Sequence, residues 1–156
     1  MNFKCIIFAG VAGFLMITIF CLKPGKISGI YQNTSFEEHW GRECQSTVVL
    51  VDNSPVTKNN LFKLWERERG RILNQWNPLN NKCDYILFIN NKPEPPHDSE
   101  EIKYWIGDYQ LCLKGETGNC ISKDERLFYI GMDKQIYGDK SAGEFGNKKL
   151  YISFID

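Results

Sequence analysis

The sequence predicts an α+β fold, in which an N-terminal transmembrane helix precedes a small mixed sheet made of one β-α-β unit and an antiparallel meander. One main helix and two disulfides complete this prediction. Three observations support it: residues 5–22 carry no charge, residues 58–76 repeat apolar side chains at helical spacing, and four cysteines follow the apolar run. The chain has 156 residues, which suits one domain of ordinary size.

Residues 5–22 read CIIFAGVAGFLMITIFCL. A helix of this length rises about 27 Å, which is close to the thickness of the hydrocarbon core of a bilayer. A cleaved signal peptide is the alternative, but it would place small residues just before the cut, whereas here they lie in the middle of the run. The sequence therefore predicts a transmembrane anchor over residues 1–22, with the membrane contacted through residues 5–22.

Four cysteines lie beyond the anchor, and CxxC spacing, which is typical of zinc and dithiol sites, is absent among them. Two disulfides in an oxidising compartment account for the set most simply, and four reduced structural thiols are the alternative. This predicts a single-pass protein of the bacterial inner membrane, with its C-terminal domain in the periplasm. The four residues are Cys44, Cys83, Cys112 and Cys120.

The segment after the anchor, residues 23–45, is predicted as a polar linker that contains a short first strand over 27–32. Residues 46–51 read STVVLV, an apolar β-branched run of the length of a buried strand. Asp52-Asn53-Ser54-Pro55 ends this strand with residues typical of turns. The periplasmic α+β domain is therefore predicted over residues 46–156.

The main helix is predicted over residues 58–76. Thr57 is a typical N-cap residue, and Asn77-Pro78 ends the helical pattern. Apolar residues recur at spacings of three, four, seven and eight, which places them on one face of a helix. The residues of this stripe are Leu61, Leu64, Trp65, Ile72 and Trp76.

Four later segments have the composition of strands, with a proline-rich acidic loop over 90–101 and a Gly- and Lys-rich loop over 133–147 between them. The strands are predicted at residues 84–89, 102–113, 126–132 and 149–154.

The cysteine positions predict how the strands pair. Cys44 and Cys83 stand just before the strands predicted at 46–51 and 84–89, so parallel neighbours would bring them to one edge of the sheet. In antiparallel strands they would lie about 17 Å apart, beyond the roughly 7 Å between Cα atoms that a disulfide allows. We therefore expect a Cys44–Cys83 disulfide across a β-α-β unit. Cys112 and Cys120 flank a GETGN turn and are expected to form the second disulfide.

Two sequence motifs carry a resemblance to a known family. TVVLVDNSPVT leads into the Trp-containing helix, and YQLCL and NCI hold the last two cysteines. Together with the N-terminal anchor they resemble domain-of-unknown-function family 943, small single-pass membrane proteins of enterobacteria. The likeness covers most of the chain and is best over 46–76 and 109–121. It implies a location in the cell envelope and brings no catalytic residues.

Composition and motifs indicate a protein without an enzymatic activity. Lys and Arg number 19, as do Asp and Glu, so the basic excess of a nucleic-acid-binding protein is absent. Phosphate-binding, metalloprotease and serine-hydrolase motifs are also absent. We expect no catalytic residue, no cofactor and no metal. Asp52 and the acidic loop at His97 carry the alternative, an envelope hydrolase or ligand-binding module, although an Asx turn and a solvated loop are the favoured explanations of these residues.

Aromatic residues indicate a function through contact with another protein. Trp40, Trp105 and Tyr109 are predicted to form an exposed surface for a protein partner, and ordinary sheet packing is the alternative. The expected function is protein–protein contact by a membrane-anchored periplasmic protein. A more specific version is an immunity or accessory protein for an envelope toxin or a secretion system.

Overall fold

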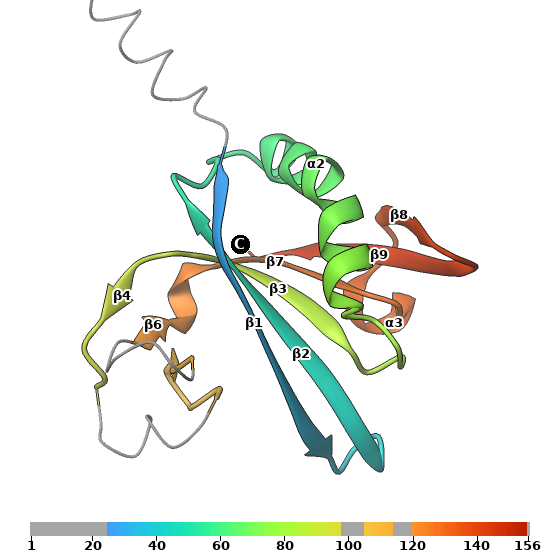
Figure 1. Ribbon diagram of the computed structural model, residues 1–156, viewed down its shortest axis with the longest axis horizontal. Coiled ribbons are helices and arrows are strands. Elements are labelled where there is room, and N and C mark those ends of the chain that lie inside the picture. The colour runs from blue at the N-terminus through green and yellow to red at the C-terminus, as the bar shows by residue number, and fades with distance from the viewer. Residues whose placement is uncertain (1–24, 98–104, 114–119, 156) are drawn as a thin grey trace, which may run out of the picture.

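The computed structural model describes residues 25–97, 105–113 and 120–155 (Figure 1). Strands are the commonest regular element in this part of the chain, and they form one six-stranded sheet and one three-stranded sheet. The strands of the main sheet are β1 Lys26–Glu37, β2 Arg42–Asp52, β3 Tyr85–Asn90, β7 Arg126–Gly131, β8 Ser141–Phe145 and β9 Lys148–Phe154. The small sheet holds β4 Pro93–Glu94, β5 Gln110–Leu111 and β6 Cys120–Ser122. The helices are α2 Lys58–Trp76, the four-residue α3 Lys134–Tyr137 and the 3-10 helix η2 Lys123–Glu125.

Two predictions are corrected by this architecture. The fold is mostly sheet, so the predicted α+β class with a transmembrane helix is wrong. Among the described residues, no helix is long and apolar enough to cross a membrane, which overturns the prediction of a single-pass inner-membrane protein with a periplasmic domain. The predicted anchor, 1–22, lies outside the described residues.

A long antiparallel hairpin of β1 and β2 occupies much of the segment predicted as a polar linker. The two strands pair from Lys26 opposite Asp52 to Glu37 opposite Arg42. Only Ser46 and the residues after it in β2 also pair with β3, so the tip of the hairpin projects beyond the rest of the sheet (Figure 1). The polar composition concealed the outer part of the hairpin, because backbone hydrogen bonds hold these strands together although residues 34–37, 42 and 43 are exposed.

The β-α-β unit is present as predicted. β2 and β3 run parallel in register from Ser46 opposite Tyr85, and α2 connects them. Thr57 caps the helix by accepting from the backbone N–H of Asn60, and the helix ends before Asn77, whose φ of 43° is left-handed. The disulfide Cys44–Cys83 joins the strand starts with 5.5 Å between Cα atoms, and Cys112–Cys120 forms the second bond.

The core lies between α2 and one face of the main sheet, whose strand order is β1-β2-β3-β7-β9-β8. Trp65 of the helix is fully buried and meets Phe88 edge to face, and Phe88 stacks on Phe128 with 4.3 Å between ring centroids. The indole Nε1 of Trp65 donates to the carbonyl oxygen of Ala142 at 2.8 Å. The helix is thereby fixed to β8 by a buried hydrogen bond as well as by packing.

The small sheet covers one end of the opposite face of the main sheet. Val48, Leu50 and Ile89 pack there in a second core with residues of the small sheet. The single long strand predicted over 102–113 is replaced by the two residues of β5 and a bridge between Ile106 and Leu111, while 98–104 lies outside the described residues. The Gly- and Lys-rich loop predicted at 133–147 contains α3 and β8.

Candidate functional site

The face of the main sheet that α2 does not cover is called the open face here. Because side chains alternate along a strand, Asn33, Ser35 and Glu37 of β1 point to this face together with Ser46 of β2. Tyr85 of β3 continues the row on the neighbouring strand. The small sheet covers the other end of this face, so these side chains remain available to a ligand.

Two pockets hollow the open face. The hairpin pocket, about 630 Å³, lies beside the β1–β2 hairpin, and the sheet pocket, about 510 Å³, lies over β3, β7 and β9. Four residues line both pockets, so together they form one open-face groove. The shared residues are Tyr85, Ile106, Ile136 and Tyr137.

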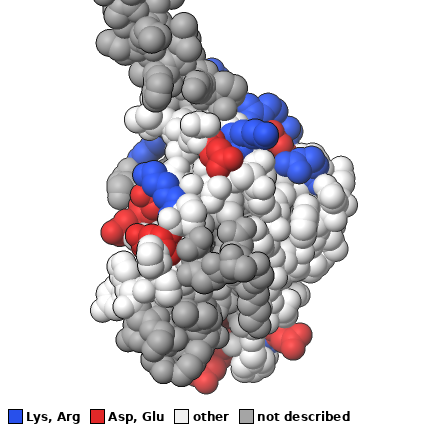
Figure 2. Space-filling model, turned by 60° about the vertical axis from the view of Figure 1, so that its left-hand side comes forward, with Lys and Arg blue, Asp and Glu red and all other residues white. Residues whose placement is uncertain are grey.

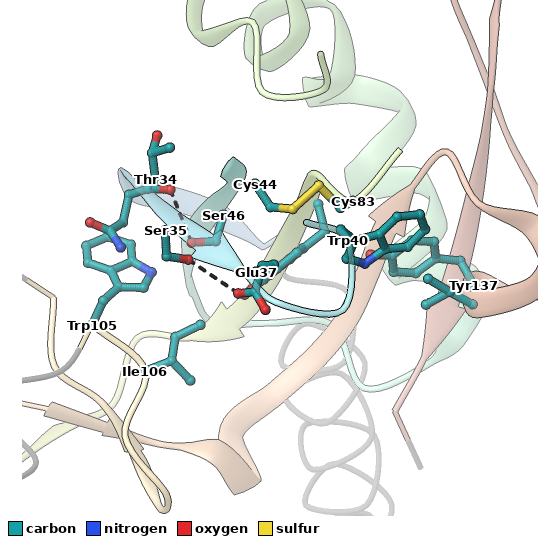
Figure 3. A pocket seen from close by; sticks show the side chains of 13 residues that line it. Thr34, Ser35, Glu37, Trp40, Cys44, Ser46, Cys83, Trp105, Ile106 and Tyr137 are labelled. Carbon is teal, nitrogen blue, oxygen red and sulfur yellow. Dashed lines mark hydrogen bonds between the residues drawn. A yellow bond between two sulfur atoms is a disulfide. The ribbon is translucent and has the colours of Figure 1, made fainter. Parts of the chain in front are cut away.

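Two tryptophans from distant segments face the hairpin pocket. Trp40 comes from the hairpin turn and Trp105 from the segment before β5, and Figure 3 shows them on opposite sides with Glu37 between them. The Glu37 carboxylate accepts a hydrogen bond from the Ser35 hydroxyl at 3.3 Å. Aromatic faces around a carboxylate can hold an apolar or a cationic group.

The indole of Trp105 has an unsatisfied hydrogen-bond donor. The side chain is only 9 % exposed, and its Nε1 has no hydrogen-bond partner among the described residues. In Figure 3 the nitrogen lies on the side of the ring that faces Ser35 and Glu37. A buried N–H without an acceptor costs about 1–3 kcal/mol, so a ligand that brings an acceptor to this position gains that amount.

The sheet pocket combines an apolar floor with two cationic side chains. Leu87 and Leu111 line it, and Lys123 and Arg126 lie at its border with Tyr129. Arg126 donates from Nε to the carbonyl oxygen of Lys123 at 2.6 Å and from a terminal nitrogen to the Tyr129 hydroxyl at 3.4 Å. The two acceptors, a carbonyl oxygen and a hydroxyl, are neutral. They hold the guanidinium of Arg126 in place but do not compensate its positive charge.

Tyr137 reaches the groove because a glycine lies beneath it. A Cβ atom on Gly131 would stand 2.0 Å from the nearest ring atom of Tyr137. Real Cβ contacts are never that short, so the ring occupies the space that a side chain at Gly131 would need. The position of Tyr137 in the groove therefore depends on this glycine.

Two tyrosines of the groove, Tyr85 and Tyr137, are un-ionised at neutral pH. Burial, together with Tyr129 and the Glu37 carboxylate, raises the pKa of Tyr85 to about 12. Burial also raises the pKa of Tyr137 above its usual range. Both phenols are therefore present as hydroxyls that can donate and accept hydrogen bonds.

Of the three residues predicted as a partner surface, two lie together in the structure and one lies apart from them. Trp40 and Trp105 line the same hairpin pocket although they are 65 positions apart in the sequence. Tyr109 is 70 % exposed and lines neither pocket. The structure thus brings two of the predicted residues together at the groove and places the third outside it.

The residues behind the alternative prediction lie away from the groove. Asp52 accepts a hydrogen bond of 2.8 Å from Asn91 and lines a separate pocket at the ends of β2 and β3. His97 is exposed, with its Nε2 3.6 Å from Glu94, and it does not line that pocket. Within the ranges that the structure describes, no three His, Cys, Asp or Glu side chains gather as a metal site requires.

Glu37, Tyr85, Ile136 and Tyr137 are among the groove residues that the sequence did not indicate. Glu37 and Tyr85 flank the Cys44–Cys83 disulfide, so the cysteine pattern was the signal that could have found them. Ile136 and Tyr137 fall in a segment that has the composition of a loop. No local pattern marks these two, because only the pairing of β7 with β9 brings α3 to the open face.

Charge is distributed in small groups over the surface. On the face shown in Figure 2, Lys and Arg gather near the top beside Asp and Glu, and a wide area of described residues without charge lies below them. On α2 the carboxylate of Glu68 pairs with Arg67 and Arg71. These arginines therefore belong to a solvated helix face with internal ion pairs.

Comparisons with protein-family models, with curated proteins and with solved structures found no match to this chain. Membership in family 943 stays a prediction.

Proposed function

We propose that this protein acts by protein–protein contact, and that the open-face groove binds a segment of a partner polypeptide. The observation that carries this proposal is the pair Ile106 and Ile136. Both line the two pockets, and they are 36 % and 54 % exposed. Apolar side chains exposed at the rim of a concave, aromatic site are typical of surfaces that bind another molecule.

The chemistry of the groove supports a polypeptide as its ligand. Trp, Tyr and Ile side chains supply large apolar contact areas, which dominate the energy of protein interfaces. The Trp105 N–H requires an acceptor, and a polypeptide carries a carbonyl oxygen at every residue. Each pocket has room for a side chain, so a short extended segment could fill both.

The alternative with a catalytic or ligand-binding site at Asp52 has less support. The Asp52 carboxylate already accepts a hydrogen bond from the Asn91 side chain. Residues 98–101 of the acidic loop lie outside the described residues. An immunity or accessory protein acts through contact of the proposed kind, and that more specific role stays a prediction.

Site-specific photocrosslinking tests the proposal. A benzophenone amino acid replaces Ile136 in the full-length chain, and the matched control replaces Val56, which is 92 % exposed and lines neither pocket. We expect a discrete crosslinked partner from position 136 and none from position 56. Equal products from both positions, or none from position 136, would contradict the proposal.

Binding by the purified partner completes the test. The partner is titrated against the wild type and against the Ile136→Glu and Val56→Glu variants. A charge buried at a contact is costly, so Ile136→Glu is expected to weaken binding at least about tenfold, whereas Val56→Glu leaves the affinity unchanged. Equal affinities of the two variants would place the contact elsewhere.

A further inference from the structure

The two pockets of the groove carry opposite charges, and neither charge is compensated within the described residues. Glu37 lines the hairpin pocket, and Lys123 and Arg126 line the sheet pocket. Among the residues that the structure describes, none of these three takes part in an ion pair. The groove is thus negative at one end and positive at the other, with an apolar middle.

On the basis of the proposed function, we propose that the groove selects a partner segment with an apolar residue in the middle. A basic residue lies on one side of it and an acidic residue on the other, in either chain direction. The basic side chain occupies the hairpin pocket beside Glu37. The apolar side chain lies between Ile106 and Ile136, and the acidic side chain pairs with Arg126 and Lys123.

The hairpin pocket is suited to a cation by more than its carboxylate. Trp40 and Trp105 present aromatic rings on opposite sides of Glu37, and such rings attract Lys and Arg side chains. Tyr85 and Tyr137 add two neutral hydroxyls. These groups line the same pocket as the carboxylate, so the pocket offers a cation an ion pair, cation–π contacts and hydrogen bonds.

Trp105 provides an independent indication that a polar group enters this pocket. Its Nε1 is buried and lacks an acceptor in the described part of the chain. A cationic side chain has no acceptor, so the backbone carbonyl of the same partner residue is the group that satisfies the indole. A basic residue in a polypeptide supplies both the charge for Glu37 and the acceptor for Trp105.

The strand register places one basic residue opposite Glu37. Arg42 stands opposite Glu37 in the register of β1 and β2, although no ion pair joins them. It does not line the hairpin pocket. Replacement of Arg42 by Gln removes this positive charge from the neighbouring strand and is expected to strengthen binding of a basic segment.

A display library of random dodecapeptides, selected on the immobilised full-length protein, tests the proposal. Clones that bind the wild type but not the Ile136→Glu variant are groove-dependent. We expect these clones to combine a basic, an apolar and an acidic residue. A synthetic peptide of the most enriched clone is expected to lose about fivefold in affinity at low ionic strength with Glu37→Gln, and likewise with Arg126→Gln or Lys123→Gln.

Glu38→Gln is the matched control, because Glu38 is also exposed and lines neither pocket. It is expected to leave the affinity unchanged. Charge reversal adds a rescue: Glu37→Lys should bind the peptide whose basic residue is replaced by glutamate better than it binds the original peptide. A merely structural role of Glu37 would give no such exchange.

The outcomes separate this inference from the function on which it rests. Groove-dependent clones with apolar residues but no charge preference would overturn the charge rule and leave the protein–protein function standing. Clones with the charge pattern that respond equally to Glu37→Gln and Glu38→Gln would also overturn it. A selection without any groove-dependent clone would contradict both proposals.

Discussion

The carboxylate of Asp84 accepts a hydrogen bond of 2.8 Å from the backbone N–H of Gln45. Asp84 directly follows Cys83 and Gln45 directly follows Cys44, so this bond lies beside the Cys44–Cys83 disulfide. Its second oxygen accepts from the backbone N–H groups of Asn80 and Asn81, each at 2.7 Å. Asp84 is completely buried. The edge of the sheet that borders the hairpin pocket is therefore held by a covalent bond and by a buried carboxylate side by side.

Replacing this carboxylate is expected to be costly. Asp84→Asn keeps the size of the side chain but turns an amide N–H₂ toward backbone donors, so at least one buried N–H loses its acceptor. We expect the free energy of unfolding, measured with urea, to fall by about 2–3 kcal/mol. The exposed Asp124→Asn serves as the control and should change it by less than about 0.5 kcal/mol. Equal effects of the two variants would show that the three hydrogen bonds contribute little.

The two disulfides are expected to differ in their effect on stability. Cys44 and Cys83 are 39 positions apart, whereas Cys112 and Cys120 are 8 apart. Because a longer closed loop restricts the unfolded chain more, Cys44→Ala with Cys83→Ala should cost about 4 kcal/mol and Cys112→Ala with Cys120→Ala about 2.5 kcal/mol. Denaturation of both double variants under the same conditions measures the difference. The reverse order would mean that strain or residual structure outweighs loop length.

The contact between Gly131 and Tyr137 predicts an unusual pair of glycine substitutions. Gly131→Ala forces the Tyr137 ring out of its place and is expected to lower the free energy of unfolding by about 1–3 kcal/mol. Gly70→Ala, in the middle of α2 with open space around it, should raise the free energy by about 1 kcal/mol.

A double variant identifies the cause of the Gly131 effect. Tyr137→Ala removes the ring that the new Cβ atom meets, so adding Gly131→Ala to it should cost little further stability. A full additional loss in the double variant would attribute the effect to the backbone of β7 rather than to the ring.

The raised pKa of Tyr85 predicts a specific loss of stability at alkaline pH. The ordinary tyrosine pKa is about 10, and in the folded protein that of Tyr85 is about 12. Its neutral form therefore contributes full stability below pH 10, and this contribution disappears as the pH rises through about 12. The loss amounts to about 3 kcal/mol for a shift of this size.

Tyr85→Phe cannot ionise, so its free energy of unfolding should fall less than that of the wild type between pH 10 and pH 12. Urea denaturation at a series of pH values measures this difference, with Tyr109→Phe as an exposed control that should follow the wild type. Parallel curves for Tyr85→Phe and the wild type would contradict the assignment of the raised pKa to Tyr85.

The parts of the fold that the sequence predicted correctly are those with local or covalent signals. The helix over 58–76 has an N-cap at Thr57, a terminator at Asn77 and a regular apolar stripe, and each of these acts within a few residues. The parallel pairing of β2 and β3 followed from Cys44 and Cys83, because a disulfide sets a distance that only one strand direction satisfies.

The parts that were predicted wrongly depend on contacts between distant segments. The outer half of the β1–β2 hairpin is polar on both faces, so it lacks the alternation by which a strand is recognised. The strand predicted over 102–113 has the composition of a core strand, but its described part, 105–113, packs on the open face instead of joining the main sheet. At the site, Trp40 and Trp105 were identified as aromatics, but their joint position in the hairpin pocket with Glu37 required the tertiary structure.

The hydrogen bond from Trp65 to Ala142 has a consequence for the order in which the chain folds. Donor and acceptor are 77 residues apart, and β9, which carries β8, follows later still. During synthesis α2 is made well before the strand that accepts its bond, so the part of the core that β8 and β9 contribute is missing until the last strands leave the ribosome. A chain that has emerged from the ribosome only as far as β7 would therefore hold β1, β2, α2, β3 and β7 with exposed core residues, a species prone to aggregate and to be bound by chaperones.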